Sequence, residues 1–78
     1  MKTKKYVKQI IRDISTIGYG FDKIKDIDSF KYDLYFDDYD MVELVTACEN
    51  YFNIEIEDKE FESWATVADV IKTVKGKL

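Results

Sequence analysis

The middle of this 78-residue chain reads Asp37-Asp38-Tyr39-Asp40-Met41-Val42-Glu43-Leu44-Val45-Thr46-Ala47-Cys48-Glu49-Asn50-Tyr51-Phe52. Its apolar residues recur at steps of three and four, the spacing of one buried helix face. They are Met41, Leu44, Val45, Cys48 and Phe52. Asp37 is a favourable N-cap, and Asp40 stands three residues later, where a carboxylate can complete a capping box. The segment therefore predicts a helix of about four turns with an acidic first turn.

A second amphipathic pattern covers about Thr3 to Ile17. Its apolar stripe consists of Val7, Ile10, Ile11, Ile14 and Ile17. Thr3 can cap the start of this helix, and Gly18 with Gly20 can end it. We therefore expect an N-terminal helix that buries one isoleucine-rich face.

The C-terminal part predicts one more helix and a short one before it. Thr66 and Asp69 have the spacing of a capping box, and an apolar stripe follows at Val67, Val70, Ile71 and Val74. The segment from Asp58 to Ser63 has room for one short helical turn. Residues 53–58 alternate like a strand, but a lone strand has no partner, so we expect an extended connector there.

A long connection, residues 18–36, separates the first two predicted helices. It is longer than most helix connections, so it should be held by buried side chains. The expected anchors are Phe21, Ile24, Ile27 and Phe30. The chain as a whole, residues 1–78, therefore predicts a single all-α domain, a four-helix bundle with three longer helices and one short helix.

Charge is unevenly distributed along the chain, whose formal net charge is −4. Residues 31–62 carry two Lys or Arg against eleven Asp or Glu, whereas the segments on either side are net positive. An acidic middle of this density repels nucleic acid and anionic membranes and attracts a basic protein surface. We expect a monomer with such a protein partner.

Few residues could support catalysis or hold a metal. The chain has no histidine and one cysteine, so it lacks a Cys-His pair, a His ligand and an internal disulfide. Cys48 invites a thioester or redox function, but its place on the apolar stripe favours a buried, inert thiol. We therefore expect no enzyme and no dedicated metal site. With no signal-peptide pattern and no long apolar run, a cytoplasmic location is expected.

The acidic segment resembles the signature of acyl carrier proteins, Asp-Ser-Leu-Asp-x-Val-Glu-Leu, which here reads Asp37-Asp38-Tyr39-Asp40-Met41-Val42-Glu43-Leu44. The resemblance extends over residues 3–75. It implies a long loop after the first helix and a 4′-phosphopantetheine arm on the serine of the motif. Asp38 occupies that position, so no cofactor is expected. Three origins of Asp38 stay open: drift after loss of the site, imitation of the charge of a modified serine, and engineering.

The resemblance also indicates a partner-binding surface on the second helix. The matching or neighbouring positions are Asp37, Asp38, Tyr39, Asp40, Glu43, Thr46 and Glu49. It implies a basic partner, with an acyl-transfer or biosynthetic enzyme as one possibility. The leading interpretation is a carrier-derived binding module without an arm. The alternative is an ordinary acyl carrier protein of fatty-acid, polyketide or related metabolism.

Phe61 and Trp64 stand where carriers place smaller side chains that line the cavity for the acyl chain. Their size indicates that they fill this volume or simply belong to the core of a small domain. We expect Phe30, Val42, Cys48, Phe52, Ile56 and Ile71 to close around them. No sizeable pocket should then separate the second helix from residues 58–71.

Overall fold

Four helices make up the fold of the computed structural model, which describes residues 2–15 and 23–78. They are α1 (Thr3–Ile14), α2 (Asp38–Phe52), α3 (Asp58–Phe61) and α4 (Val67–Lys77). Within the described residues there is no strand, only an isolated bridge between Ser29 and Thr66. This confirms the expected all-α fold of three longer helices and one short one, and residues 54–57 form a connector without regular structure.

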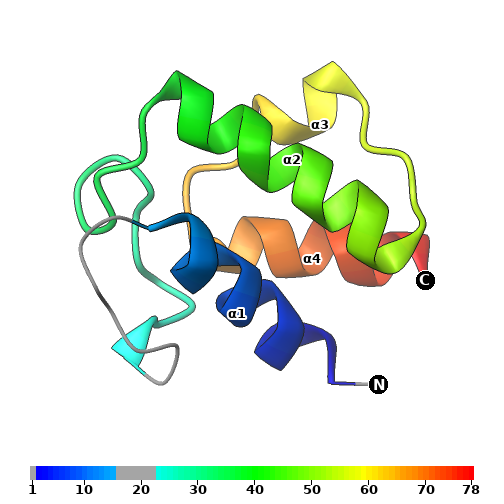
Figure 1. The fold of residues 1–78 in the computed structure, drawn as a ribbon, viewed down its shortest axis with the longest axis horizontal. Helices are drawn as coiled ribbons and strands as arrows, with labels where there is room; N and C mark the ends of the chain where they lie inside the picture. Colours follow the sequence, from blue (N-terminus) through cyan, green and yellow to red (C-terminus); the bar gives the residue numbers. More distant parts are fainter. Residues whose placement is uncertain (1, 16–22) are drawn as a thin grey trace.

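α1 packs against both α2 and α4, so it lies at the centre of the helix contacts. Figure 1 shows α2 running across the molecule, with α3 beside it and α4 beneath it. The loop of residues 23–37 leads from one end of the molecule up to the start of α2. This arrangement leaves one long side of α2 facing solvent.

The two ends of α2 follow from the residues found there. Asp37 accepts a hydrogen bond from Asp40 N at 2.8 Å, and Asp40 accepts one from Asp37 N at 3.1 Å. The predicted capping box is therefore confirmed. At the other end Asn53 adopts the left-handed conformation (φ 55°) that commonly ends helices. The predicted Thr3 cap is wrong, because α1 has Lys2 as its N-cap and Thr3 is buried inside the first turn.

The core gathers apolar side chains from α1, α2, α4 and the loop. The predicted stripes are confirmed: Val7 and Ile11 of α1, and all four residues of the α4 stripe, are buried. On α2 the buried residues are Leu44, Cys48 and Phe52, with Met41 and Val45 packed beside them. The predicted Ile17, Gly18, Gly20 and Phe21 lie outside the described residues. The predicted end of the first helix at Ile17 is wrong, because α1 ends at Ile14 and Ser15 is already extended.

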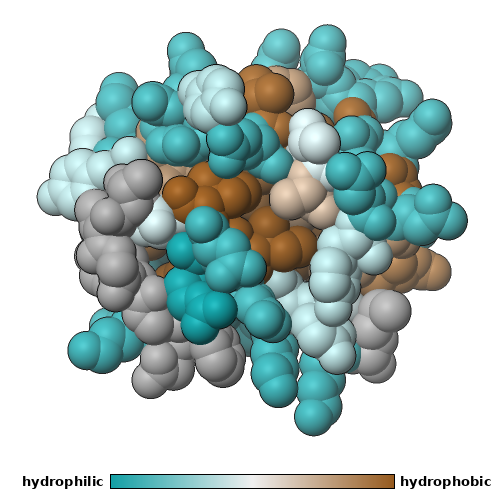
Figure 2. Space-filling model, viewed as in Figure 1, coloured by the Kyte–Doolittle hydropathy of each residue, from teal (hydrophilic) through white to brown (hydrophobic). Residues whose placement is uncertain are grey.

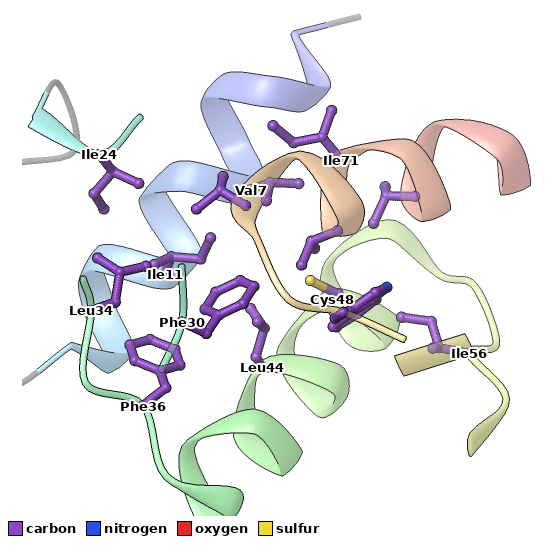
Figure 3. Packing of buried hydrophobic residues seen from close by; sticks show 14 of the residues in the cluster. Val7, Ile11, Ile24, Phe30, Leu34, Phe36, Leu44, Cys48, Ile56 and Ile71 are labelled. Atoms are coloured by element: carbon purple, nitrogen blue, oxygen red, sulfur yellow. The ribbon is translucent and has the colours of Figure 1, made fainter. Parts of the chain in front are cut away.

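The loop is held by a different set of anchors from the one the sequence predicts. Ile24 and Phe30 are buried as expected, but Ile27 is 80% exposed, so that prediction is wrong. Leu34 and Phe36 are buried in its place. Figure 3 shows the Phe30 ring next to Leu44 of α2, with the Phe36 ring on the other side of Phe30. The two ring centres lie 5.4 Å apart. The loop is thus part of the core and fixes where α2 begins.

The same loop also completes the start of α4. The carbonyl of Asp28 accepts from Val67 N at 3.1 Å, and that of Asp26 accepts from Ala68 N at 2.9 Å. The Asp26 carboxylate in turn binds Lys4 and Lys8 of α1, each at 2.8 Å. Asp26 therefore joins the loop to α1 through its side chain and to α4 through its backbone.

Candidate functional site

The exposed side of α2 carries most of the acidic residues expected at a partner surface. Asp37, Asp38, Glu43 and Thr46 are exposed, and Asp40 is half-buried. Asp40, Glu43 and Thr46 share one side of α2, because residues three apart on a helix lie close together. Asp38 lies instead on the side of Met41 and Val42. Asp38 is the first residue of α2, where a negative charge interacts favourably with the helix dipole.

Not every predicted residue is available to a partner. The carboxylates of Asp37 and Asp40 are both used in the capping box. Glu49 is half-buried, and its Oε2 accepts from the backbone N of Ile56 at 2.8 Å. Glu49 therefore holds the connector after α2. The Glu43 carboxylate accepts a hydrogen bond from the Tyr39 phenol, whereas Asp38 takes no part in the capping box or the connector.

Tyr39 projects from the first turn of α2 and is 71% exposed. A hydrogen bond to Glu43 and the nearby charges of Glu43 and Asp40 raise the pKa of the Tyr39 phenol. The phenol is therefore protonated and neutral at physiological pH. The acidic side of α2 consequently carries an aromatic ring between its carboxylates.

Two depressions flank the first turns of α2. The first, about 410 Å³, lies between Met41 and Val42 of α2 and the segment of Phe61 and Trp64, with Asp38 and Glu62 also lining it. The second, about 460 Å³, runs from Met41 toward the loop over Phe30, Phe36 and Trp64. Asp38, Met41 and Trp64 line both, so the depressions adjoin.

Two known proteins are similar in sequence to this chain over most of its length. The chain is 38% identical over 69 residues to an acyl carrier protein of Wolinella succinogenes, covering 88% of each chain. It is 39% identical over 70 residues to one of a Sulfurovum species, covering 90% of this chain and 91% of that protein. The chain belongs to the acyl carrier protein family. A scan against models of protein families finds no match.

A solved structure places the whole fold in the same family. It is a protein assigned as an acyl carrier protein from Mycobacterium tuberculosis, with a TM-score of 0.86 and 26% identity. The match covers 95% of this chain and 96% of the other. The long loop and the short α3 of this acyl carrier family member are therefore part of a shared architecture.

The predicted packing around Phe61 and Trp64 is confirmed for most of the named residues but not for all of them. Trp64 is buried and donates from Nε1 to Thr73 Oγ1 at 3.0 Å, while Phe61 is half-buried. Phe30, Cys48, Phe52, Ile56 and Ile71 are buried as predicted, but Val42 is 54% exposed, so its predicted burial is wrong. The expectation of no sizeable pocket is also wrong, because the 410 Å³ depression lies between α2 and residues 61–64. Val42 is turned outward at the rim of that depression and cannot close over Phe61 and Trp64.

Cys48 is fully buried, which confirms the prediction for this residue. Burial, with a smaller effect of Glu49, raises the pKa of its thiol to about 12. The thiol is thus neither accessible nor ionised at physiological pH. Among residues 2–15 and 23–78 no group of three potential ligands is close enough to hold a metal ion, and none of the helices described there could cross a membrane.

Sequence reasoning missed the contribution of the loop to this site. Phe36, Lys31 and Tyr32 line the second depression, and the Lys31 Nζ lies 5.4 Å from the centre of the Tyr32 ring. The signal in the sequence was the apolar spacing of Phe30, Leu34 and Phe36 just before the acidic helix. The spacing of these three residues matches neither a helix nor a strand. Their burial can therefore be understood only from the turn that residues 29–34 form in the structure.

Proposed function

We propose that this acyl carrier family member is a non-enzymatic binding module that takes no phosphopantetheine arm and docks a basic protein surface through α2. The observation that carries the proposal is the exposed carboxylate of Asp38 at the first position of α2. By resemblance, this is where carriers have the serine that holds the arm. The cytoplasmic location and the monomeric state stay predictions from the sequence.

The side chain of Asp38 is not suited to carry the phosphopantetheine arm. Attachment needs a hydroxyl that attacks the pyrophosphate of coenzyme A and leaves a stable phosphodiester. A carboxylate is a poor nucleophile for that step, and its product would be a labile mixed anhydride. The serines of the chain lie elsewhere: Ser15 at the end of α1, Ser29 in the loop and Ser63 after α3.

Ser29 is the serine that shares a depression with Asp38, and its hydroxyl already has a structural role. Its Oγ accepts a hydrogen bond from Tyr32 N at 3.1 Å, within the turn that leads to Leu34. By resemblance, the attachment serine of carriers stands at the start of the acidic helix, whereas Ser29 lies in the loop before it. We therefore propose no transfer of the arm to this hydroxyl either.

Protein docking is supported by the charge and exposure of α2. The segment of residues 31–62 contains eleven acids and two bases, and Asp38 and Glu43 face solvent. Opposite charges across an interface accelerate association and exclude wrong partners. The surface therefore suits a partner whose docking face is rich in lysine and arginine.

The missing arm is tested by mass spectrometry. Incubation with coenzyme A and a broad-specificity phosphopantetheinyl transferase should leave the intact mass of the protein unchanged. The variant Asp38→Ser restores a hydroxyl at the same helix position and is the matched comparison. A gain of one arm by the unaltered chain would overturn the proposal and establish the ordinary carrier function.

Docking is tested by reversing charge on α2. Asp40 is unsuitable for reversal because it caps the helix, so the test pair is Asp38→Lys with Glu43→Lys. Association with acyl-transfer enzymes of the same organism should slow by roughly tenfold at low salt, since exposed charges steer encounter. The control pair Asp13→Lys with Glu55→Lys changes net charge equally on other surfaces and should have a small effect. A partner that binds both pairs alike would place the docking surface elsewhere.

A further inference from the structure

A depression of about 330 Å³ between α1 and α4 has a basic lining. Three lysines, two apolar residues and one acid form this lining. They are Lys4, Lys72, Lys75, Ala68, Ile71 and Asp26. Figure 2 shows long hydrophilic side chains at the lower edge of the view, where α1 begins in Figure 1. No residue of α2 lines this depression, so the acidic docking surface does not account for it.

Asp26 does not neutralise the depression. Its carboxylate binds both Lys4 and Lys8 of α1, and the hydrogen bonds from these two lysines lower its pKa. One negative charge is therefore shared by two lysines, while Lys72 and Lys75 add two positive charges from α4. The Lys4 side chain is 53% exposed despite its ion pair. The region keeps an excess of positive charge that solvent can reach.

The lysines of α4 differ in whether the fold supplies them with a partner. Lys77 binds Glu60 at 2.9 Å. Lys72 and Lys75 are exposed and form no ion pair within residues 2–15 and 23–78, although the charge of Lys72 has a small effect on Asp69. The helix dipole favours a cation at Lys75 in the last turn, but Lys72 lies in the middle of α4. The stability of α4 therefore does not explain why these two like charges stand on one side of it.

We propose that this depression docks an acidic segment of a partner protein, whose carboxylates contact the lysines of α1 and α4. The charge of the depression is complementary to such a segment. This is a second docking surface, separate from the proposed binding through α2. One copy of the chain can then hold a basic partner and an acidic partner at the same time.

The depression suits carboxylates on a peptide better than a single phosphate. Phosphate sites commonly combine cations with free backbone amides. Ala68 lines the depression, but its backbone N already donates to the Asp26 carbonyl at 2.9 Å. The lysines are distributed over two helices, and Ala68 and Ile71 give the depression apolar lining for the methylene groups of glutamate. The net charge of −4 opposes binding to nucleic acid or an anionic membrane.

Two alanine-rich helical peptides test the surface. They are identical except for glutamate or glutamine at two positions that lie one helical turn apart. The glutamate peptide should shift the amide NMR signals of residues 4–8 and 68–75 in the isotope-labelled protein. It should bind roughly tenfold more tightly than the glutamine peptide, as two exposed charge pairs in water predict. Raised salt should reduce this difference.

Matched pairs of variants locate the binding. Lys72→Glu with Lys75→Glu should remove the preference for glutamate. The control pair Lys31→Glu with Lys59→Glu changes net charge equally at exposed positions outside the depression, and it should keep the preference. All four positions are exposed, so both pairs should fold, as circular dichroism can check.

Several outcomes would overturn the inference. Equal binding of the two peptides would do so, as would a glutamate preference that survives the reversal of Lys72 and Lys75. Inorganic phosphate that shifts the same amide signals at the same concentration would assign the depression to a small anion. Binding to phosphatidylglycerol vesicles, or self-association at low salt, that Lys72→Glu with Lys75→Glu abolishes would assign it to a membrane or to a second copy. Each of these results leaves the proposed docking through α2 standing, because that function is tested by variants of α2.

Discussion

Tyr35 adopts a backbone conformation that few side chains favour. Its φ is 57°, in the left-handed region, and the side chain is exposed in the turn between two buried loop residues, Leu34 and Phe36. That conformation costs a non-glycine residue about 1–2 kcal/mol. The strain is tolerated because the neighbours on both sides must point into the core.

Replacing this residue should relieve the strain. Tyr35→Gly is expected to stabilise the domain by about 0.5–1 kcal/mol, the left-handed penalty less the extra entropy of glycine in the unfolded chain. Urea unfolding measures the change. Tyr32→Gly, at an equally exposed tyrosine with ordinary backbone geometry, should instead lose stability. A loss in both variants would show that Tyr35 is not strained.

Trp64 contributes through packing and through one hydrogen bond. Trp64→Ala should lower the free energy of unfolding by about 3–5 kcal/mol, as large core truncations do. Trp64→Phe keeps much of the packing but leaves Thr73 Oγ1 without its donor, so a loss of about 1–2 kcal/mol is expected. Thermal or urea unfolding measures both. Equal losses in the two variants would mean that the indole packing adds little beyond the hydrogen bond.

For the helices, the sequence correctly predicted the features that depend on residues close together in the chain, namely the caps and the apolar stripes. The capping residues Asp37, Asp40 and Asp69 act over three positions, and each apolar stripe depends on one helix period. The outward position of Val42 and the exposure of Ile27 depend instead on how helices and loop pack, which no local pattern contains. The acidic side of α2 was predicted for the same local reason. The hydrogen bond from Ile56 N to the Glu49 carboxylate could not be predicted, because it depends on the path of the connector after α2.

The start of α4 depends on one carboxylate. Asp69 accepts hydrogen bonds from Ala65 N at 2.8 Å and Thr66 N at 2.9 Å. Asp69→Ala should cost about 1–2 kcal/mol, as the loss of a helix cap does, and should speed hydrogen exchange in the first turn of α4. Lys72→Ala, at an exposed position of the same helix, is the comparison and should change little. Unaltered exchange at residues 65–68 would contradict this role.

For the molecule as a whole, three carboxylates of the described residues contribute to the dependence of stability on pH, because folding lowers their pKa values. Hydrogen bonds to Lys4 and Lys8 lower the pKa of Asp26. Backbone hydrogen bonds from Glu57 and from Ala65 lead the causes that lower the pKa of Glu60 and of Asp69. Because each pKa is lower in the folded state, the stability that these groups add is fully present above their ordinary pKa. It is lost as the pH falls through the folded values.

The free energy of unfolding measured with urea should therefore be nearly constant from about pH 6 to 8, where the chain has no histidine to titrate, and should fall below about pH 4. The double variant Asp26→Asn with Asp69→Asn should be less stable at neutral pH and lose less on acidification. Circular dichroism at each pH gives the midpoints. An equally steep acid loss in the double variant would show that other groups are responsible.

The carbonyls of Asp26 and Asp28 that receive the first amides of α4 also bear on how the chain folds as it is made. The ribosome produces these acceptors about forty residues before their donors at Val67 and Ala68, because synthesis runs from the N-terminus. The loop can therefore reach its final form only after the last helix has been synthesised. Contacts this distant in sequence slow folding relative to a bundle with purely local contacts. The nascent domain should thus complete its structure only once residues 67 and 68 have left the ribosome and can donate to the carbonyls of the loop.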